Sequence, residues 1–396
     1  GSNNTAVGHT ALYSNTTADA NTAVGYQSSY FNTTGANNST LGFSAGKGNT
    51  TGGHNTSIGQ SAGRATNSGS ANTSVGSDAL RTNSTGANNT SMGKDALYSN
   101  TTASNNTGVG YRALYYNTTS NNNTAVGFEA AFNNSTGSVT ALGRYAARQN
   151  TTGTNNVALG LDAGYSTTTG SYNTSVGVSA LQSNTTASNN TAVGYRSLQA
   201  NTATQNTAVG QDSFYTNTTG TGGAALGFMA GYSNTTGRSN TAIGYQSLLS
   251  NTTANNNTAV GFEALKDNTT GANNTSVGHQ SALNNTTGAD NISMGQASLA
   301  TNTTGSNNVA LGYAALVLNT TASYNTAVGY QAAYSNTTGQ YNTALGRLSF
   351  VDNTTGNENV ALGNNALANN TTASNNVAVG STALFSNTTA SNNTAV

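Results

Sequence analysis

A short strand-like motif that ends in glycine recurs at a fixed interval along the whole chain. It reads Asn-Thr-Ala-Val-Gly at residues 21–25, and its variants carry Ser for Ala or Leu, Ile or Met for Val. From Gly8 to Gly380 the closing glycine returns every 17 residues, with two exceptions. The exceptions are intervals of 16 residues, from Gly127 to Gly143 and from Gly194 to Gly210. A fixed period of this length indicates one structural unit stacked many times. We number each unit, or coil, from its glycine as position one.

The period and the composition together predict the fold class. A coil of 17 residues rich in Gly, Asn and Thr lacks the helix formers that a pair of helices needs. A disordered polar tract has no reason to keep an aliphatic residue in register over 23 coils. We therefore predict an all-β parallel β-solenoid (β-roll) of about 23 coils. Residues 1–396 are expected to form one continuous array, a segment of a longer fibre.

Residue size at each position predicts which side chains face inward. Position seventeen is always aliphatic or Met, position sixteen is small and position four is Ala or Ser. We expect positions seventeen and four to be buried, because positions of constant size are typical of a packed core. Positions two and five vary widely in size, so we expect them on a surface, within a second short strand over positions two to six. The predicted core ladder comprises Val24, Leu41, Val126, Leu159, Val260, Leu311 and Val379.

The second half of the coil reads as a turn. It carries the pattern Asn-Thr-Thr-Gly/Ala-x-Asn-Asn, as in residues 268–274, and these residue types favour turns. Both 16-residue coils lose their residue in this half, while the strand half keeps its register. A loop tolerates a deletion, whereas a strand shifted by one residue turns its side chains to the wrong face.

One coil contains little apolar material, so something else must stabilise the stack. Ladders of Asn side chains and backbone groups along the stack are one source of stability. A core shared by several chains is another, and small residues at positions four and sixteen permit close approach. The sequence leaves both open.

Composition excludes several function classes. Charged residues make up 6% of the chain and the formal net charge is zero, so we expect no nucleic-acid partner. Cysteine is absent, which excludes disulfides and thiolate chemistry, and no apolar run is long enough to span a membrane. The three histidines and the carboxylates lie coils apart. We therefore expect no enzyme activity, no cofactor and no metal site.

The strand motif is similar to the head repeats of trimeric autotransporter adhesins, whose Ser-Val-Ala-Ile-Gly core motif resembles residues 156–160 and 376–380. The longer unit resembles repeats of bacterial and phage tail-fibre proteins. The likeness covers the whole chain, but the coil here is longer than the adhesin repeat by an Asn-Thr-Thr-rich loop. The resemblance implies a left-handed β-roll, three chains wide, on a cell or virion surface.

Three features are candidates for function. The first is the Asn-x-Ser/Thr sequon at position eight, which predicts either N-glycosylation or a hydrogen-bonded turn ladder. These sequons include Asn15, Asn32, Asn100, Asn184, Asn251, Asn336 and Asn387. The second is the Thr-Thr pair, an ice-binding candidate, although adjacent threonines cannot both face outward from one strand. The third is an aromatic stripe at positions two and six, which indicates packing or a sugar-binding strip and is interrupted at Lys47, Arg64 and Arg81.

These observations favour a structural extracellular fibre or filament shaft, located at a cell or virion surface. Its expected partner is itself, as a trimer or as an end-to-end filament. The alternative is a binding module whose repetitive face recognises host-surface or matrix glycans, or ice.

Overall fold

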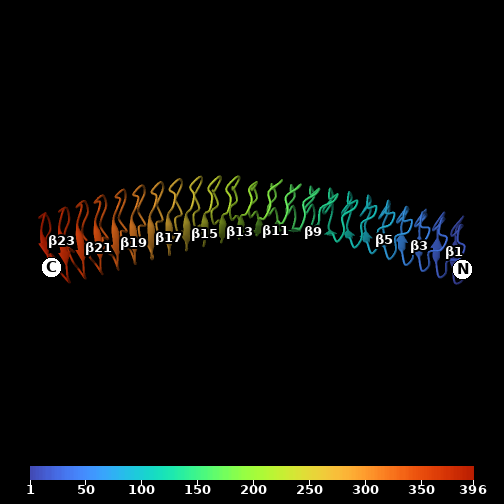
Figure 1. Ribbon diagram of the computed structural model, residues 1–396, viewed down its shortest axis with the longest axis horizontal. Coiled ribbons are helices and arrows are strands. Elements are labelled where there is room, and N and C mark those ends of the chain that lie inside the picture. Colours follow the sequence, from blue (N-terminus) through green and yellow to red (C-terminus); the bar gives the residue numbers. More distant parts are fainter. The chain divides into compact units, whose positions relative to one another are not determined.

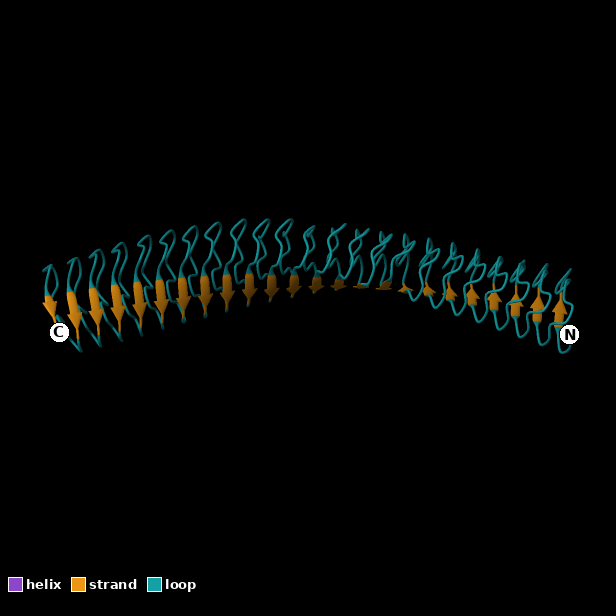
Figure 2. Cartoon of the chain, in the orientation of Figure 1, coloured by secondary structure: helices purple, strands orange, loops and turns teal.

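A computed structural model describes residues 1–396, and it contains strands, turns and loops but no helix. The chain forms two compact units, residues 1–196 and 197–396. The sequence predicts one continuous array. The boundary between the two units falls inside the second 16-residue coil, between Gly194 and Gly210. In each unit the strands line up along one side of the stacked coils (Figure 2).

The first unit contains twelve short strands in chain order (Figure 1). They are β1 (Thr5–Val7), β2 (Thr22–Val24), β3 (Ser39–Leu41), β4 (Thr56–Ile58), β5 (Thr73–Val75), β6 (Thr90–Met92), β7 (Thr107–Val109), β8 (Thr124–Val126), β9 (Val139–Leu142), β10 (Asn156–Leu159), β11 (Thr174–Val176) and β12 (Thr191–Val193).

The second unit also contains twelve strands. They are β13 (Thr207–Val209), β14 (Ala224–Leu226), β15 (Thr241–Ile243), β16 (Thr258–Val260), β17 (Thr275–Val277), β18 (Ile292–Met294), β19 (Val309–Leu311), β20 (Thr326–Val328), β21 (Thr343–Leu345), β22 (Val360–Leu362), β23 (Val377–Val379) and β24 (Thr394–Ala395).

Within each unit every strand pairs in parallel with the strand one coil away. Strand β15 pairs with β16 so that Ala242 lies beside Ala259 and Ile243 beside Val260. Each residue therefore has its repeat equivalent as a direct neighbour, which is the register that the 17-residue period predicts. The predicted parallel β-solenoid is confirmed in both units.

The first short coil confirms the division into strand and loop. Strand β9 pairs with β8 through Thr140 beside Thr124 and with β10 through Leu142 beside Leu159, so the ladder keeps its register across the deletion. Val139 stands where most coils have Asn, and its N–H donates to the Oδ1 of Asn123 at 2.6 Å.

The prediction of a second strand over positions two to six is wrong. These residues form turns in which positions three and five adopt positive φ, for example 51° at Gln246 and 53° at Leu248. Their N–H groups still donate to neighbouring coils: Leu248 N–H to Ala264 O and Gln246 N–H to Phe228 O, both at 2.9 Å. Hydrogen bonding along the stack therefore continues outside the strands.

The core is also different from the prediction. Position sixteen points inward and position seventeen outward, so the predicted core ladder lies on the outer face. Leu41 is 50% exposed, Leu159 is 43% exposed and Val126 is 37% exposed. The remaining members are half-buried, and they are Val24, Val260, Leu311 and Val379. The physical reason is space, because the strand face inside the narrow coil has room only for the small residue at sixteen.

Position five supplies the large side chains of the core, although its variable size suggested a surface. Most of its leucines are fully buried, as at Leu97 and Leu248, and so is Phe214. At Phe214 the larger side chain is compensated in the next coil. A Cβ added at Gly231, one coil after Phe214, would overlap the Phe214 ring, so this glycine leaves the space that the larger ring fills.

This compensation predicts a coupled pair of substitutions. Gly231→Leu is expected to destabilise the second unit by about 1–3 kcal/mol, because the new side chain overlaps Phe214. Backbone strain is not the cause, since Leu248 adopts a similar φ at the equivalent position. The double variant Phe214→Leu/Gly231→Leu restores the common Leu-over-Leu arrangement and should recover most of the loss. Urea denaturation of the four chains measures the coupling, and additive effects would contradict the packing account.

Two files of buried Asn complete the core, as the predicted Asn ladders require. At position fourteen the N–H of Asn274 donates to the Oδ1 of Asn257 at 2.9 Å, and the Asn257 Nδ2 donates to Gly271 O at 2.9 Å. At position eight the Nδ2 of Asn268 donates to the Oδ1 of Asn251 at 3.1 Å and to Gly271 O at 2.9 Å. The same pattern recurs through both units, so side-chain amides satisfy backbone groups that the turns leave unpaired.

Candidate functional site

The aliphatic row is the set of position-seventeen side chains on the outer face of the strands. Besides the members of the predicted core ladder, it includes Ile58 and Met92 in the first unit and Leu226 and Ile243 in the second, all more than a third exposed. Since strands pair in register, consecutive members are neighbours along the stack. Monomeric soluble proteins rarely expose a contiguous apolar patch above roughly 600 Å². A row that recurs in every coil is therefore typical of a surface that another molecule covers.

Aromatic side chains at position two stack into short files beside this row. In the second unit Tyr245 and Phe262 stack with ring centroids 5.1 Å apart and planes 7° apart, and Phe228 and His279 extend the file. Each ring face inside the file is covered by its neighbours, so the file presents ring edges outward. Sugars stack on ring faces rather than edges, and this arrangement therefore argues against the predicted sugar-binding strip.

The position-eight sequons are turn ladders in the folded chain. Asn32, Asn100, Asn184, Asn251 and Asn336 are fully buried, and Asn15 and Asn387 are half-buried. The Asn100 Nδ2 donates to Asn83 Oδ1 at 2.9 Å and to Ala103 O at 3.0 Å. An N-glycan replaces one of these amide hydrogens and needs open space, so burial makes the five fully buried residues unsuitable acceptors.

A second set of sequons, which was not predicted as a site, lies exposed at position thirteen. These residues occupy a turn with φ near 60° and read Asn-Asn-Thr or Asn-Asn-Ser. They are Asn3, Asn37, Asn88, Asn105, Asn122, Asn189, Asn256, Asn273 and Asn392. Both sets match the same pattern, and only the burial of one of them distinguishes the two.

Asn100 and Asn105 test this distinction within a single coil. When the chain is secreted from a glycosylating host, glycan is expected at Asn105 and not at Asn100. Asn155 is a matched control, because it is equally exposed but Val157 replaces the required hydroxyl residue. Glycopeptide mass spectrometry reads all three. If folded protein carried a glycan on Asn100, the amide ladder at position eight would not be needed for folding.

The Thr-Thr pairs divide into one bonded and one exposed threonine. The Thr252 hydroxyl at position nine donates to Thr269 O at 3.2 Å, whereas Thr253 at position ten is exposed. Each unit thus presents a single file of threonine in this loop rather than a flat double row. A flat lattice of hydroxyls is what the ice-binding alternative needs.

Charged side chains at position six are usually neutralised. Arg148 pairs with Glu129 at 2.7 Å, and Lys266 pairs with Glu263 at 2.6 Å. Hydrogen bonds from Lys266 and then Gln280 lower the pKa of the Glu263 carboxyl. Each pair is therefore locally balanced and offers no free charge.

The exception is the basic groove, in which Lys47, Arg64 and Arg81 come from three consecutive coils of the first unit. The groove has a volume of about 510 Å³, and Phe31 stands at one end. Small residues at position seven, Gly48 among them, leave the hollow beside the three cations. In the sequence the cations only interrupt the aromatic stripe, but their equal 17-residue spacing is the signal that places them side by side.

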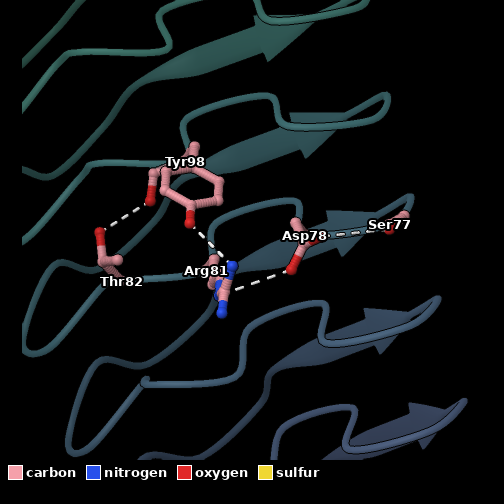
Figure 3. A network of polar contacts seen from close by, with 5 residues as sticks. All are labelled: Ser77, Asp78, Arg81, Thr82 and Tyr98. Carbon is pink, nitrogen blue, oxygen red and sulfur yellow. Dashed lines mark hydrogen bonds and ion pairs between the residues drawn. The ribbon is translucent and has the colours of Figure 1, made fainter.

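Only one of the three cations has a carboxylate partner. Arg81 lies 3.5 Å from Asp78 and donates to the Tyr98 hydroxyl at 2.7 Å (Figure 3). The Lys47 ammonium lies 6.0 Å from the centre of the Tyr30 ring. Arg64 is exposed and makes no ion pair. The groove therefore carries a local excess of positive charge in a chain whose formal net charge is zero.

The three histidines lie in three different coils. His9 and His279 are members of separate aromatic stacks, and no cluster of three His, Cys, Asp or Glu side chains could hold a metal ion. The structure has no helix that could cross a membrane. No protein-family model matches the chain, and no curated protein matches it.

Proposed function

We propose that this chain is a structural segment of an extracellular fibre, in which copies of the chain associate through the aliphatic row. The observation that carries the proposal is the exposure of large aliphatic side chains at position seventeen in coil after coil. Burying such a row removes apolar surface from water at about 25 cal/mol per Å², and the gain grows with every coil. Because each coil stacks directly on the next, equivalent side chains form one interface that continues along the stack.

The interior of each coil supports a mechanical role. Asn ladders, strand pairing and turn hydrogen bonds all run along the stack, so each coil is tied to the next at several points. Few backbone N–H and C=O groups remain unpaired, so we expect the folded stack to resist proteases. From the resemblance to adhesin heads and tail fibres, we propose more specifically that the coil is left-handed. We also propose that three chains form a bundle at a cell or virion surface.

Cysteine substitution tests the proposed interface, because the chain has no cysteine of its own. Ile243→Cys places a thiol in the aliphatic row, and Thr236→Cys places one in the exposed loop of the same coil. Mild oxidation is expected to cross-link chains through position 243 and not through position 236. Equal cross-linking at both positions, or none at position 243, would exclude the row as the interface.

A further inference from the structure

We propose that the basic groove at Lys47, Arg64 and Arg81 binds a linear acidic polysaccharide. The three cations occupy position six of consecutive coils, and strands in neighbouring coils lie about 4.8 Å apart. They therefore form a short straight file of positive charge. A linear polysaccharide with a carboxylate or sulfate on successive sugars presents a matching file of negative charge.

The charge in this groove is unbalanced, unlike that at the other position-six cations. Arg148 and Lys266 each have a carboxylate within 2.7 Å, while Lys47 and Arg64 have none. Like charges one coil apart repel one another, and an anion in the groove relieves that repulsion. Guanidinium groups also bind carboxylate or sulfate oxygens in pairs, which favours Arg64 as the central contact.

Polar side chains in the groove suit a hydroxylated ligand. Asn67 replaces the Thr or Ser found at position nine of the other coils, and its side-chain amide makes no hydrogen bond within the chain. The Asn67 amide can therefore both donate to and accept from a sugar hydroxyl. Phe31, 46% exposed, gives the groove an aromatic end wall.

Nucleic acid fits these observations less well. A nucleic-acid site gains most of its affinity by neutralising many phosphates, and three cations with one partner carboxylate supply little. Single strands also need several aromatic rings for base stacking, whereas Phe31 is the one aromatic residue among those that line the groove. The groove therefore favours a polysaccharide.

Binding of defined oligosaccharides tests the proposal. The probes are a fractionated oligogalacturonate, which is carboxylated, and a chondroitin sulfate oligosaccharide, with a maltooligosaccharide as the neutral control. Titration calorimetry is expected to show binding of at least one anionic probe that weakens as salt rises. The tighter of the two identifies the preferred anionic group. Binding of neither, or equal binding of the neutral probe, would overturn the proposal.

Substitutions locate the site. Arg64→Gln should weaken binding roughly tenfold, because it removes the unpaired guanidinium. Glutamine fits this position, since Gln182 occupies it in another coil of the same unit. Lys266→Gln is the matched control outside the groove and should leave affinity unchanged. An unaffected Arg64→Gln chain, or tighter binding of a single-stranded DNA of equal charge, would contradict the assignment.

The groove and the aliphatic row use different positions of the coil, so the two proposals fail separately. Sedimentation of the Arg64→Gln chain is expected to show the same particle mass as the unsubstituted chain. Lost ligand binding with unchanged mass supports the groove as an independent site. A change in mass would mean that the substitution acts through assembly, and this would overturn the groove assignment.

Discussion

Asn257→Asp is expected to destabilise the second unit strongly at neutral pH, and acid should reverse most of the loss. The carboxylate keeps an acceptor for the Asn274 N–H but removes the donor to Gly271 O. Asn257 is fully buried, so the ionised form is penalised in the folded chain and its pKa rises above the unfolded value near 3.9. Protonation restores a donor.

The expected loss of folding free energy follows from the difference between the folded and unfolded pKa of the new aspartate. Keeping the acid protonated at pH 7 costs at most about 4 kcal/mol relative to an unfolded pKa near 3.9. Because the folded pKa is raised, this penalty is largest above the folded pKa and shrinks as pH falls toward the unfolded value. Asn257→Ala instead leaves the Asn274 N–H unpartnered and Gly271 O with only its bond from Asn268, which should cost about 1–3 kcal/mol at any pH.

The neighbouring residue is the control. Asn256→Asp makes the same chemical change at position thirteen, where the side chain is exposed and an aspartate, Asp290, already occurs in a later coil. Its effect should stay below about 0.5 kcal/mol. Urea denaturation at pH 4 and pH 7, with hydrogen exchange of the Asn274 amide, measures the difference. Equal effects of the two aspartates would show that the Asn ladder does not stabilise the stack.

Charges in the aliphatic row are expected to abolish self-association and leave the fold intact. The variant carries Asp at Leu226, Val260 and Met294, which lie in alternate coils so that the new charges do not sit side by side. These side chains point outward, so the isolated chain can solvate the carboxylates. An interface would bury them without partners, which should weaken association by more than about a hundredfold.

A matched variant places the same charges elsewhere on the same coils. Thr219→Asp, Thr253→Asp and Thr287→Asp substitute the exposed position-ten threonines. This chain should associate as the unsubstituted chain does. Light scattering behind size-exclusion chromatography compares the two, and far-ultraviolet circular dichroism confirms that both are folded. If both sets of charges dissociate the particle equally, net charge rather than the row controls assembly.

The architecture could be predicted because the coils of this one sequence can be compared with one another. The 17-residue period predicted parallel strands in register, and the deletion between Gly127 and Gly143 located the loop. The expected Asn ladders follow from the same logic, since a side chain that recurs in every coil meets its own copy in the next coil.

The direction of the strand side chains could not be predicted from constancy of size alone. Position seventeen was expected inside because its residues vary little in size, yet Leu41 and Leu159 lie on the outer face. The stronger signal was the strictly small residue at position sixteen, which reflects a lack of space. Position five was expected on a surface because its size varies, yet a pair such as the large Phe214 beside the small Gly231 can vary in size and still fill the core.

In the candidate site, too, the sequence does not reveal which side chains are buried. Asn100 and Asn105 both match the sequon, and only burial distinguishes them. The groove at Arg64 depends on three side chains that the sequence spaces equally, but its volume depends on the small neighbours that leave it open. Spacing along a repeat predicts which residues meet, whereas depth and exposure require the folded coil.

The mass of the particle in solution tests the central claim most directly. One chain has a mass of 39.6 kDa. Sedimentation equilibrium of the unsubstituted protein over a range of concentrations is expected to give an integral multiple of that mass, threefold for the proposed bundle. A single species of 39.6 kDa at every concentration, with the aliphatic row still exposed, would contradict the proposal that this row joins chains into a fibre.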